Sequence, residues 1–173
     1  MTYDFDTVND RRSEFSMKWD VNDGELPMWV ADMDFKTAPE ITEAIVKRAE
    51  HGIFGYTDVP ARWKNAVISW YKKRHSLTIE YDSLMFSTGV VAAISSIVRK
   101  LTTPNENVVL LTPVYNIFFN SIINNGCRAL ECPLIYDGEK YEINWTDFEE
   151  KLSDKQTTLF ILCNPHNPTG VIW

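Results

Sequence analysis

The segment with the clearest chemical potential follows an apolar run near residue 160. Residues 159–163 read Leu-Phe-Ile-Leu-Cys and lead directly into Asn164-Pro-His-Asn-Pro-Thr-Gly170. A short apolar run predicts a buried strand of a parallel sheet, and α/β proteins bind ligands beyond the carboxyl ends of such strands. The pattern therefore predicts an asparagine amide presented to a ligand at this edge. The alternative is a turn fixed only by its prolines.

Two residues of the same segment could carry other chemistry. His166 could act as a general base, or could bind a metal together with Cys163. Two candidate ligands do not make a zinc site, and a free cysteine at the end of an apolar strand is expected to face the core. We therefore predict no metal site and no catalytic role for His166.

A second candidate site is Ser87-Thr-Gly-Val-Val-Ala92, which lies between a short apolar run and a helical pattern. The first N–H groups of a helix have no intrahelical acceptor and suit a phosphate. Gly89 would let the backbone approach such an anion closely. The motif is neither the Walker pattern nor the dinucleotide-binding pattern, so on its own a capped helix start is the commoner explanation.

Four further residues have both a structural and a chemical interpretation. Tyr115 follows the next apolar run and, taken alone, is a core aromatic. Tyr56 lies in a glycine-rich loop and, taken alone, packs in its turn. Asp32 and Asp34 could be paired carboxylates for acid–base chemistry, but we expect them to cap and order the N-terminal segment.

Taken in chain order, five motifs resemble the class I/II aminotransferase superfamily of pyridoxal-phosphate (PLP) enzymes. The resemblance extends over essentially the whole chain, up to Trp173. It implies PLP as the cofactor and an α/β fold of the aspartate-aminotransferase type (PLP fold type I), whose large domain has a mainly parallel sheet. The motifs are 26–35, 52–57, 87–92, 112–115 and 164–170.

The resemblance also implies which residues hold the cofactor. The backbone of Gly89, Val90 and Val91 would bind the PLP phosphate, while the two valine side chains would lie in the core. The ring of Tyr115 would stack on the pyridine ring. The side chain of Asn167 would donate to the phenolic oxygen and so tune the cofactor's electronics.

Two further implied roles lie in the first third of the chain. Tyr56 would reach the phosphate bound by the neighbouring subunit, which makes a homodimer the expected assembly. The backbone of Val30 and Ala31 would lie beside the carboxylate of the substrate.

The form of the first two motifs narrows the resemblance. Met28-Trp-Val-Ala-Asp-Met-Asp-Phe35 and Gly52-Ile-Phe-Gly-Tyr-Thr57 are similar to the cystathionine β-lyase-like branch, which includes a bacterial regulator of maltose genes. This branch implies a C–S β-lyase that converts cystathionine or cysteine conjugates into a thiol, pyruvate and ammonia. An aminotransferase and a PLP-binding regulatory protein that acts through protein–protein contact are the alternatives, because a fold alone does not separate them.

The resemblance further implies that the chain is the N-terminal portion of such an enzyme. In the family, the lysine that binds PLP covalently, an Asp at the pyridine nitrogen and an Arg for the substrate lie downstream of the matched motifs. Their identities are therefore unknown, and residues 1–173 alone are expected to be inactive. Ser69-Trp-Tyr-Lys72 has the Ser-x-x-Lys spacing, but it precedes the phosphate turn within a helix pattern, so we interpret it as a chance match.

The elements that would position these motifs follow from the pattern of apolar residues. Residues 1–50 are expected to form an N-terminal arm and a first helix, from Pro39 to a stop at Gly52, on the small-domain side. Residues 51–173 would form the first, incomplete part of the PLP-binding large domain, where alternating strands and helices predict a parallel sheet covered on both faces. The expected strands are 84–87, 108–111, 128–132 and 158–163, and the expected helices are 60–75, 90–101, 116–124 and 145–152.

Composition limits the class of protein further. The net charge of −7 disfavours a nucleic-acid partner, and no apolar run is long enough for a membrane span. Cys127, Cys132 and Cys163 are odd in number and show no Cys-x-x-Cys spacing, which favours a reducing, cytoplasmic location. The expected partners are then an amino-acid thioether substrate and a second copy of the chain.

Overall fold

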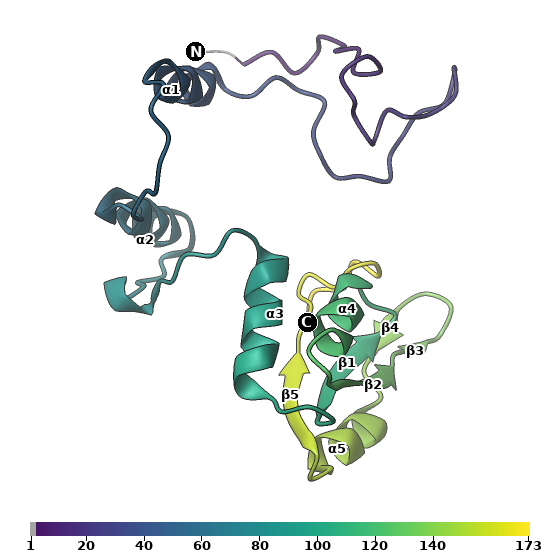
Figure 1. Ribbon diagram of the computed structural model, residues 1–173. Coiled ribbons are helices and arrows are strands. Elements are labelled where there is room, and N and C mark those ends of the chain that lie inside the picture. Colours follow the sequence, from purple (N-terminus) through teal and green to yellow (C-terminus); the bar gives the residue numbers. More distant parts are fainter. Residues whose placement is uncertain (1–2) are drawn as a thin grey trace. The chain divides into compact units, whose positions relative to one another are not determined.

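The computed structural model describes residues 3–173. Their contacts divide the chain into two units, Met1–Asp58 and Val59–Trp173, and each unit is described by itself. Figure 1 shows that most of the regular structure belongs to the second unit. The domain division expected after residue 50 concerns the whole protein and stays a prediction; residues 1 and 2 of its first part lie outside the described residues.

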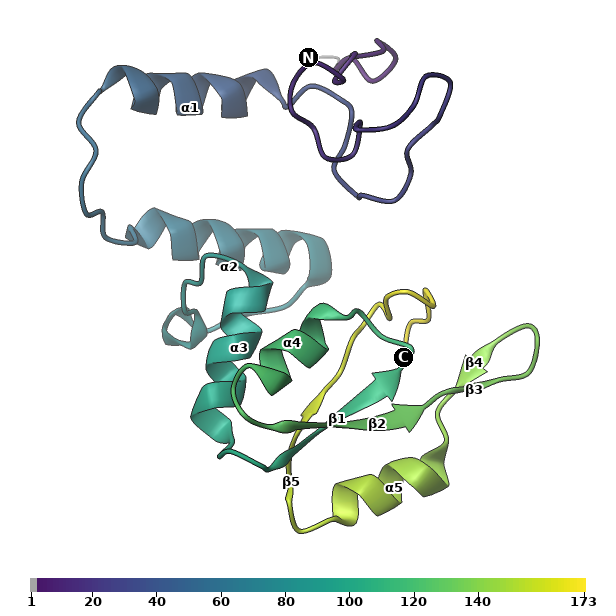
Figure 2. The same ribbon diagram turned by 45° about the vertical axis from the view of Figure 1, so that its right-hand side comes forward.

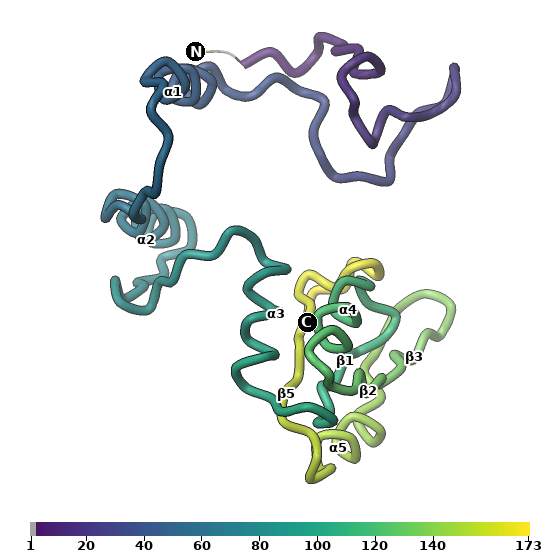
Figure 3. The backbone as a smooth tube through the Cα atoms, in the orientation of Figure 1, coloured from purple at the N-terminus to yellow at the C-terminus, as the bar shows by residue number. Residues whose placement is uncertain are grey.

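The first unit has one helix among its described residues, α1 (Pro39–Glu50). Pro39 begins the helix, and its lack of an N–H costs no hydrogen bond there because the first N–H groups of a helix have no intrahelical acceptor. Gly52 follows the helix with a left-handed φ of 68°. This confirms the helix predicted from Pro39 to the stop at Gly52. No side chain of α1 is buried. Figure 3 traces the chain before α1 as an irregular loop.

The second unit consists of short strands and helices in alternation (Figures 1 and 2). No helix in the described residues is long and apolar enough to cross a membrane. The elements of the second unit are α2 (Ala61–His75), η1 (Tyr81–Ser83), α3 (Val90–Leu101), β1 (Asn107–Thr112), α4 (Ile117–Ile123), β2 (Arg128–Pro133), β3 (Ile135–Tyr136), β4 (Tyr141–Glu142), α5 (Trp145–Ser153) and β5 (Thr157–Ile161).

Three of the strands form a parallel sheet in the order β2-β1-β5. Strand β1 lies in the middle and pairs in parallel with both neighbours, so that Leu110 is level with Glu131 of β2 and Ile161 of β5. This confirms the predicted α/β class and three of the four predicted strands.

The alternation of side chains along β1 divides the core into two layers. Val108 and Leu110 are fully buried against α3 and α4, where Val98 and Ile122 meet them. Val109 and Leu111 of β1 point to the opposite face of the sheet and pack against Phe148 of α5. Figure 2 accordingly shows α5 on the opposite side of the sheet from α4. A strand buried on both faces explains why this segment is a continuous apolar run instead of an alternating one.

The strand predicted at residues 84–87 is wrong. Among the described residues this segment pairs with no strand, and Met85 is 89% exposed. The ring of Phe86 instead packs edge to face on Trp63 of α2, with 5.5 Å between ring centroids. A strand requires a neighbour that accepts and donates its backbone hydrogen bonds, and an apolar pattern alone does not supply one.

A small antiparallel ribbon, β3–β4, follows β2. A turn at Asp137-Gly138 connects its strands, with Gly138 at a φ of 105°. The carboxylate of Asp137 accepts the backbone N–H groups of Glu139 and Lys140, each at 2.9 Å. The ribbon therefore closes through a turn that the Asp137 side chain stabilises.

Candidate functional site

Within the part of the chain that the structure describes, the start of α3 presents unpaired backbone N–H groups. Gly89 precedes the helix in an extended conformation, and no described side chain caps the first turn. The Ser87 hydroxyl donates to the Gly89 carbonyl at 3.1 Å and makes no capping hydrogen bond with the helix amides within the described residues. A Cβ added at Gly89 would meet nothing within 4 Å. The amides of Val90 and Val91 are thus open to an external acceptor, for which the helix dipole favours an anion.

The side chains of the same two valines are not where the sequence predicted them. Val90 is 73% exposed and Val91 is 47% exposed, so the prediction that they lie in the core is wrong. Both lie in the first turn of α3, whereas the helix reaches the sheet core further along, at Val98. Apolar character alone did not show which turn of the helix covers the sheet.

The loop after β1 carries Tyr115. Its ring packs edge to face on Phe118 at the start of α4, with 6.0 Å between centroids and an interplanar angle of 80°. Tyr115 is still 44% exposed, which excludes a core aromatic within the described residues. The contact with Phe118 leaves part of the Tyr115 ring exposed, so a flat ligand ring could stack on it.

The loop after β5 carries Asn167 and is closed by its own hydrogen bonds. The backbone N–H of His166 donates to Val171 O at 2.7 Å, and that of Gly170 donates to His166 O at 2.6 Å. The backbone N–H of Asn167 points to the Cys163 sulfur at 3.3 Å. The Asn167 side chain is exposed and makes no hydrogen bond within the described residues. Its amide is therefore held at the end of a fixed turn and is available to a ligand.

His166 is buried, with 1% of its surface exposed. Its Nε2 lies 3.0 Å from the carbonyl oxygen of Pro113, and its Nδ1 lies 3.1 Å from Nε1 of Trp173. Both ring nitrogens are thus engaged, in agreement with the prediction that His166 is not a general base. Cys163 packs against the core layer that contains Leu110, which confirms its predicted orientation.

These three loops lie at one edge of the sheet. The strands run in parallel, so the segments after β1 and β5 both leave at the carboxyl edge, and His166 and Pro113 join them directly. Figures 1 and 2 both draw the start of α3 beyond this same end of the sheet. The edge of a parallel sheet is where α/β proteins place ligands.

The other candidate residues belong to the first unit. Val30 is half-buried, Ala31 is exposed, and Tyr56 is fully exposed, at 112% of its reference area. Tyr56 therefore does not pack in its own turn. The roles of these three residues toward substrate or cofactor stay predictions.

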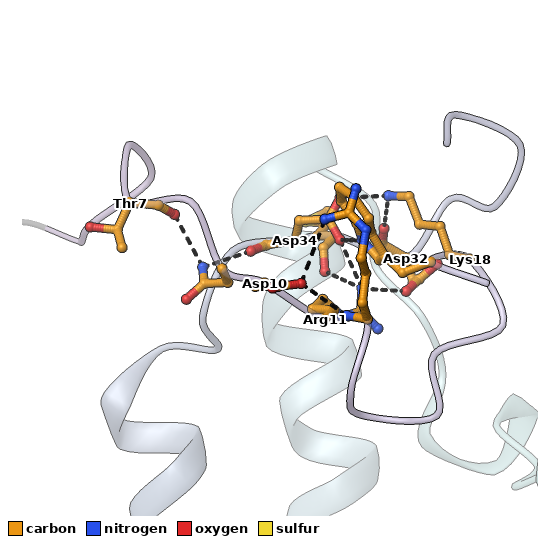
Figure 4. Close-up of polar contacts among 10 residues, drawn as sticks. Thr7, Asp10, Arg11, Lys18, Asp32 and Asp34 are labelled. Carbon is orange, nitrogen blue, oxygen red and sulfur yellow. Dashed lines mark hydrogen bonds and ion pairs between the residues drawn. The ribbon is translucent and has the colours of Figure 1, made fainter. Parts of the chain in front are cut away.

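A network of charged groups holds Asp32 and Asp34, which follow Val30 and Ala31 in the chain. Figure 4 shows the side chains of Arg11 and Lys18 converging on Asp34. Asp34 accepts from Lys18 Nζ at 2.8 Å, from Trp19 Nε1 at 2.7 Å and from Arg11 Nη1 at 2.9 Å. Arg11 also contacts Asp32 at 2.6 Å, and Lys18 donates to the Asp32 carbonyl at 2.8 Å.

The charges of this network fix the role of the two aspartates. Hydrogen bonds from Lys18, then Trp19 and Arg11, hold the pKa of Asp34 far below its usual range. A carboxylate that stays ionised and accepts three donors orders a loop and is a poor general acid. The expectation that Asp32 and Asp34 order the N-terminal segment is confirmed. Their partners Arg11 and Lys18 were not foreseen, although both are long cations upstream of an acidic pair.

The fold and the site together define a class of protein. It is an α/β protein whose parallel sheet is covered by helices on both faces. At the carboxyl edge of this sheet lie a helix start with unpaired N–H groups in the described residues, an exposed tyrosine and an exposed asparagine, which suit a planar anionic ligand. The family model described as aminotransferase class I and II matches residues 26–173. The chain belongs to this family.

Individual relatives narrow the likeness. The chain is 46% identical to the cystathionine β-lyase PatB of Bacillus subtilis over 98% of its own length and 45% of that protein. Its structure is similar to a PLP-containing crystal structure of cystalysin from Treponema denticola, with a TM-score of 0.90, 35% identity and coverage of 100% and 46% of the two chains. It is also similar to the PLP-bound C–S lyase of Staphylococcus hominis, with a TM-score of 0.88, 36% identity and coverage of 99% and 45%. The chain spans less than half the length of each.

Proposed function

We propose that the whole protein is a PLP-dependent C–S β-lyase that acts on cystathionine or related cysteine thioethers. The observation that supports the proposal is the carboxyl edge of the sheet, where the loops that bear Tyr115 and Asn167 are joined by a hydrogen bond and beyond which the start of α3 lies. The likeness to the cystathionine β-lyase of Bacillus subtilis and to the C–S lyase of Staphylococcus hominis supports the lyase reaction. Its products would be a thiol, pyruvate and ammonia, formed with the uptake of one water.

The described residues fit the proposed cofactor in three ways. The amides of Val90 and Val91 and the open space beside Gly89 suit a phosphate. The partly exposed ring of Tyr115 suits a pyridine ring, and the free amide of Asn167 suits a phenolic oxygen. When bound, PLP supplies an electron sink for the charge that develops at the substrate Cα.

Each residue has a separate task in this proposal. The helix start binds the phosphate and anchors the ligand, while Tyr115 keeps the ring in one plane. Asn167 donates an N–H to the ring oxygen and holds it against rotation. The backbone at Val30 and Ala31, ordered by Asp32 and Asp34, would orient the substrate carboxylate.

The test uses the whole protein loaded with PLP and supplied with L-cystathionine. We expect pyruvate, ammonia and homocysteine in equal amounts. Asn167→Ala should slow the reaction by roughly tenfold to a hundredfold, because a hydrogen bond to a charged group contributes about 1.5–3 kcal/mol. Absence of pyruvate with amino transfer to a 2-oxo acid would favour the aminotransferase alternative, which the family description supports. PLP binding with neither reaction would favour a regulatory protein.

Tyr56 carries the assembly part of the proposal. Its fully exposed hydroxyl would donate to the PLP phosphate of a second subunit in a homodimer, within the cytoplasm. The test mixes a Tyr56→Phe protein with a protein that lacks its PLP-binding lysine. In a mixed dimer one site carries both defects and the other carries neither, so activity should rise above both parents. No recovery despite subunit exchange would show that Tyr56 serves its own subunit.

A further inference from the structure

The loops that carry Tyr115 and Asn167 come from different strands and are tied together by one buried side chain. His166 stands next to Asn167 in the sequence, and its Nε2 lies 3.0 Å from the carbonyl oxygen of Pro113, two residues before Tyr115. Within the described residues, this is the one hydrogen bond between the two loops.

The partners of His166 fix the position of its proton. The indole N–H of Trp173 can only donate, so Nδ1 must accept at 3.1 Å. The carbonyl of Pro113 can only accept, so Nε2 must carry the hydrogen. The imidazole therefore carries its hydrogen on Nε2 and none on Nδ1. The other tautomer would set an N–H against the indole N–H of Trp173 and a lone pair against the carbonyl oxygen of Pro113.

Packing restrains the same ring. His166 is 1% exposed, and the Trp173 ring meets it edge to face, with 5.4 Å between centroids at 87°. The backbone N–H of Trp173 donates to Asn164 Oδ1 at 3.2 Å, which holds the tryptophan to the start of the same loop. A shift of either loop would break a buried hydrogen bond and leave a polar atom unpaired, which is costly.

We infer that His166 is a positioning residue that sets the spacing between the Tyr115 ring and the Asn167 amide, with Trp173 fixing its tautomer. This inference rests on the proposed function, because it assumes that both groups contact PLP. His166 acts only through these two loops, since both of its nitrogens are occupied within the protein. Binding groups must be held by such support to act on a ligand.

The test compares variants of the whole protein, with bound PLP as the probe. His166→Leu removes both hydrogen bonds, whereas His166→Gln carries an amide NH2 group that can donate to Pro113 and a carbonyl oxygen that can accept from Trp173. We expect His166→Leu to weaken PLP binding by roughly tenfold and to shift the pH titration of the PLP absorption band in the same direction as Asn167→Ala. His166→Gln should restore most of both properties.

Two further variants separate positioning from stability. Val98→Ala removes buried apolar contacts of the sheet core and should lower the melting temperature without moving the PLP titration. Combining His166→Leu with Asn167→Ala should shift the titration by less than the sum of the two single shifts, because both act on one hydrogen bond. If His166→Leu does not fold, Trp173→Phe keeps the ring packing, removes the donor to Nδ1 and should move the titration in the same direction.

The inference is overturned if folded His166→Leu, or Trp173→Phe in its place, binds PLP and titrates like the wild type with only a lower melting temperature. The proposed lyase function fails separately, if the wild type binds PLP without forming pyruvate; the spectral comparison then still decides the role of His166. A wild-type protein that binds no PLP overturns both.

Discussion

The two units of the chain are ordered by different physics. The second unit is organised around β1, whose four central residues are buried between two helical layers. In the described part of the first unit, the buried residues are Lys18 and Pro27, and the central contact is an ionised carboxylate with three donors. Non-directional burial orders one unit, and directional charge pairing orders the other.

The same contrast appears in the titratable groups. In the second unit, burial and the neighbouring Asp147 raise the pKa of Cys132 to about 11, so its thiol is neutral and packs as an apolar group. In the first unit, donors lower the pKa of Asp34, so its carboxylate remains charged. Burial suppresses charge in the sheet, whereas pairing maintains it in the N-terminal loop.

The difference teaches where external contacts are to be sought. The first unit leaves large apolar side chains uncovered, among them Met28 at 84%, Trp29 at 64% and Ile45 at 64% exposure. Extended exposed apolar surface is typical of interaction sites. The unit without an apolar core is also the unit that carries Tyr56, Val30 and Ala31, which are proposed to act toward a second subunit and a substrate.

The largest expected effect is in the sheet. Leu110 is fully buried, so Leu110→Ala in the whole protein should lower the free energy of unfolding by about 2–5 kcal/mol, through lost burial and the cavity left behind. Denaturant unfolding measures this change. Leu110→Met, which conserves volume, is the control and should cost less than about 1.5 kcal/mol. Equal losses for both variants would contradict a tightly packed layer.

A smaller and more local effect is expected from the charge network. Asp34→Asn removes the charge that pairs with Arg11 and Lys18 and leaves a buried ammonium without its carboxylate. Amide hydrogen exchange of residues 9–34 should accelerate by roughly tenfold, the equivalent of one charge-assisted hydrogen bond. The sheet should keep its exchange rates.

Asp10→Asn is the matched control for this change. Asp10 is 74% exposed and lies 3.7 Å from Arg12, so its ion pair should contribute little. Equal acceleration in the two variants would show that general charge, and not the network at Asp34, orders the loop.

The smallest effect is expected from pH. The pKa of Asp34 is lower in the folded state than the unfolded value of about 3.9, so the folded loop binds its proton less tightly. The stability that the network contributes should be complete above about pH 4 and should decline as the pH falls from there toward the folded pKa. NMR titration of the Asp34 carboxyl carbon measures this directly. A midpoint at or above the unfolded value would contradict the network.

The sequence predicted the sheet unit well because its information is local. Apolar runs and helix boundaries gave β1, β2, β5 and the helices that cover them. The prediction of a strand at residues 84–87 was wrong because a strand needs a neighbouring strand to pair with, and the sequence of the segment does not show whether one is present. The prediction that the side chains of Val90 and Val91 lie in the core was wrong because apolar character does not tell which turn of a helix meets the core.

The candidate site was predictable to a different depth. Exposed groups at strand ends, such as Asn167, follow from motif and position. The buried support of His166 was not foreseen, because it depends on a carbonyl 53 positions away in the chain. The partners of Asp34 were missed for the same reason, since loop conformation decides which cation arrives. The tryptophan at 173, an obligate donor close to His166 in sequence, was the available signal.

The parallel order β2-β1-β5 has a consequence for the path by which the ligand edge forms. Closing β1 onto β2 spans only the chain from Asn107 to Arg128, whereas closing it onto β5 spans the longer chain to Thr157. Loop closure costs more entropy as the enclosed chain lengthens, so we expect β1 to pair with β2 and α4 at a lower entropic cost than with β5. The loop that bears Asn167 follows β5 in the chain. We therefore expect the edge proposed to hold the cofactor to be completed after the β1–β2 pair.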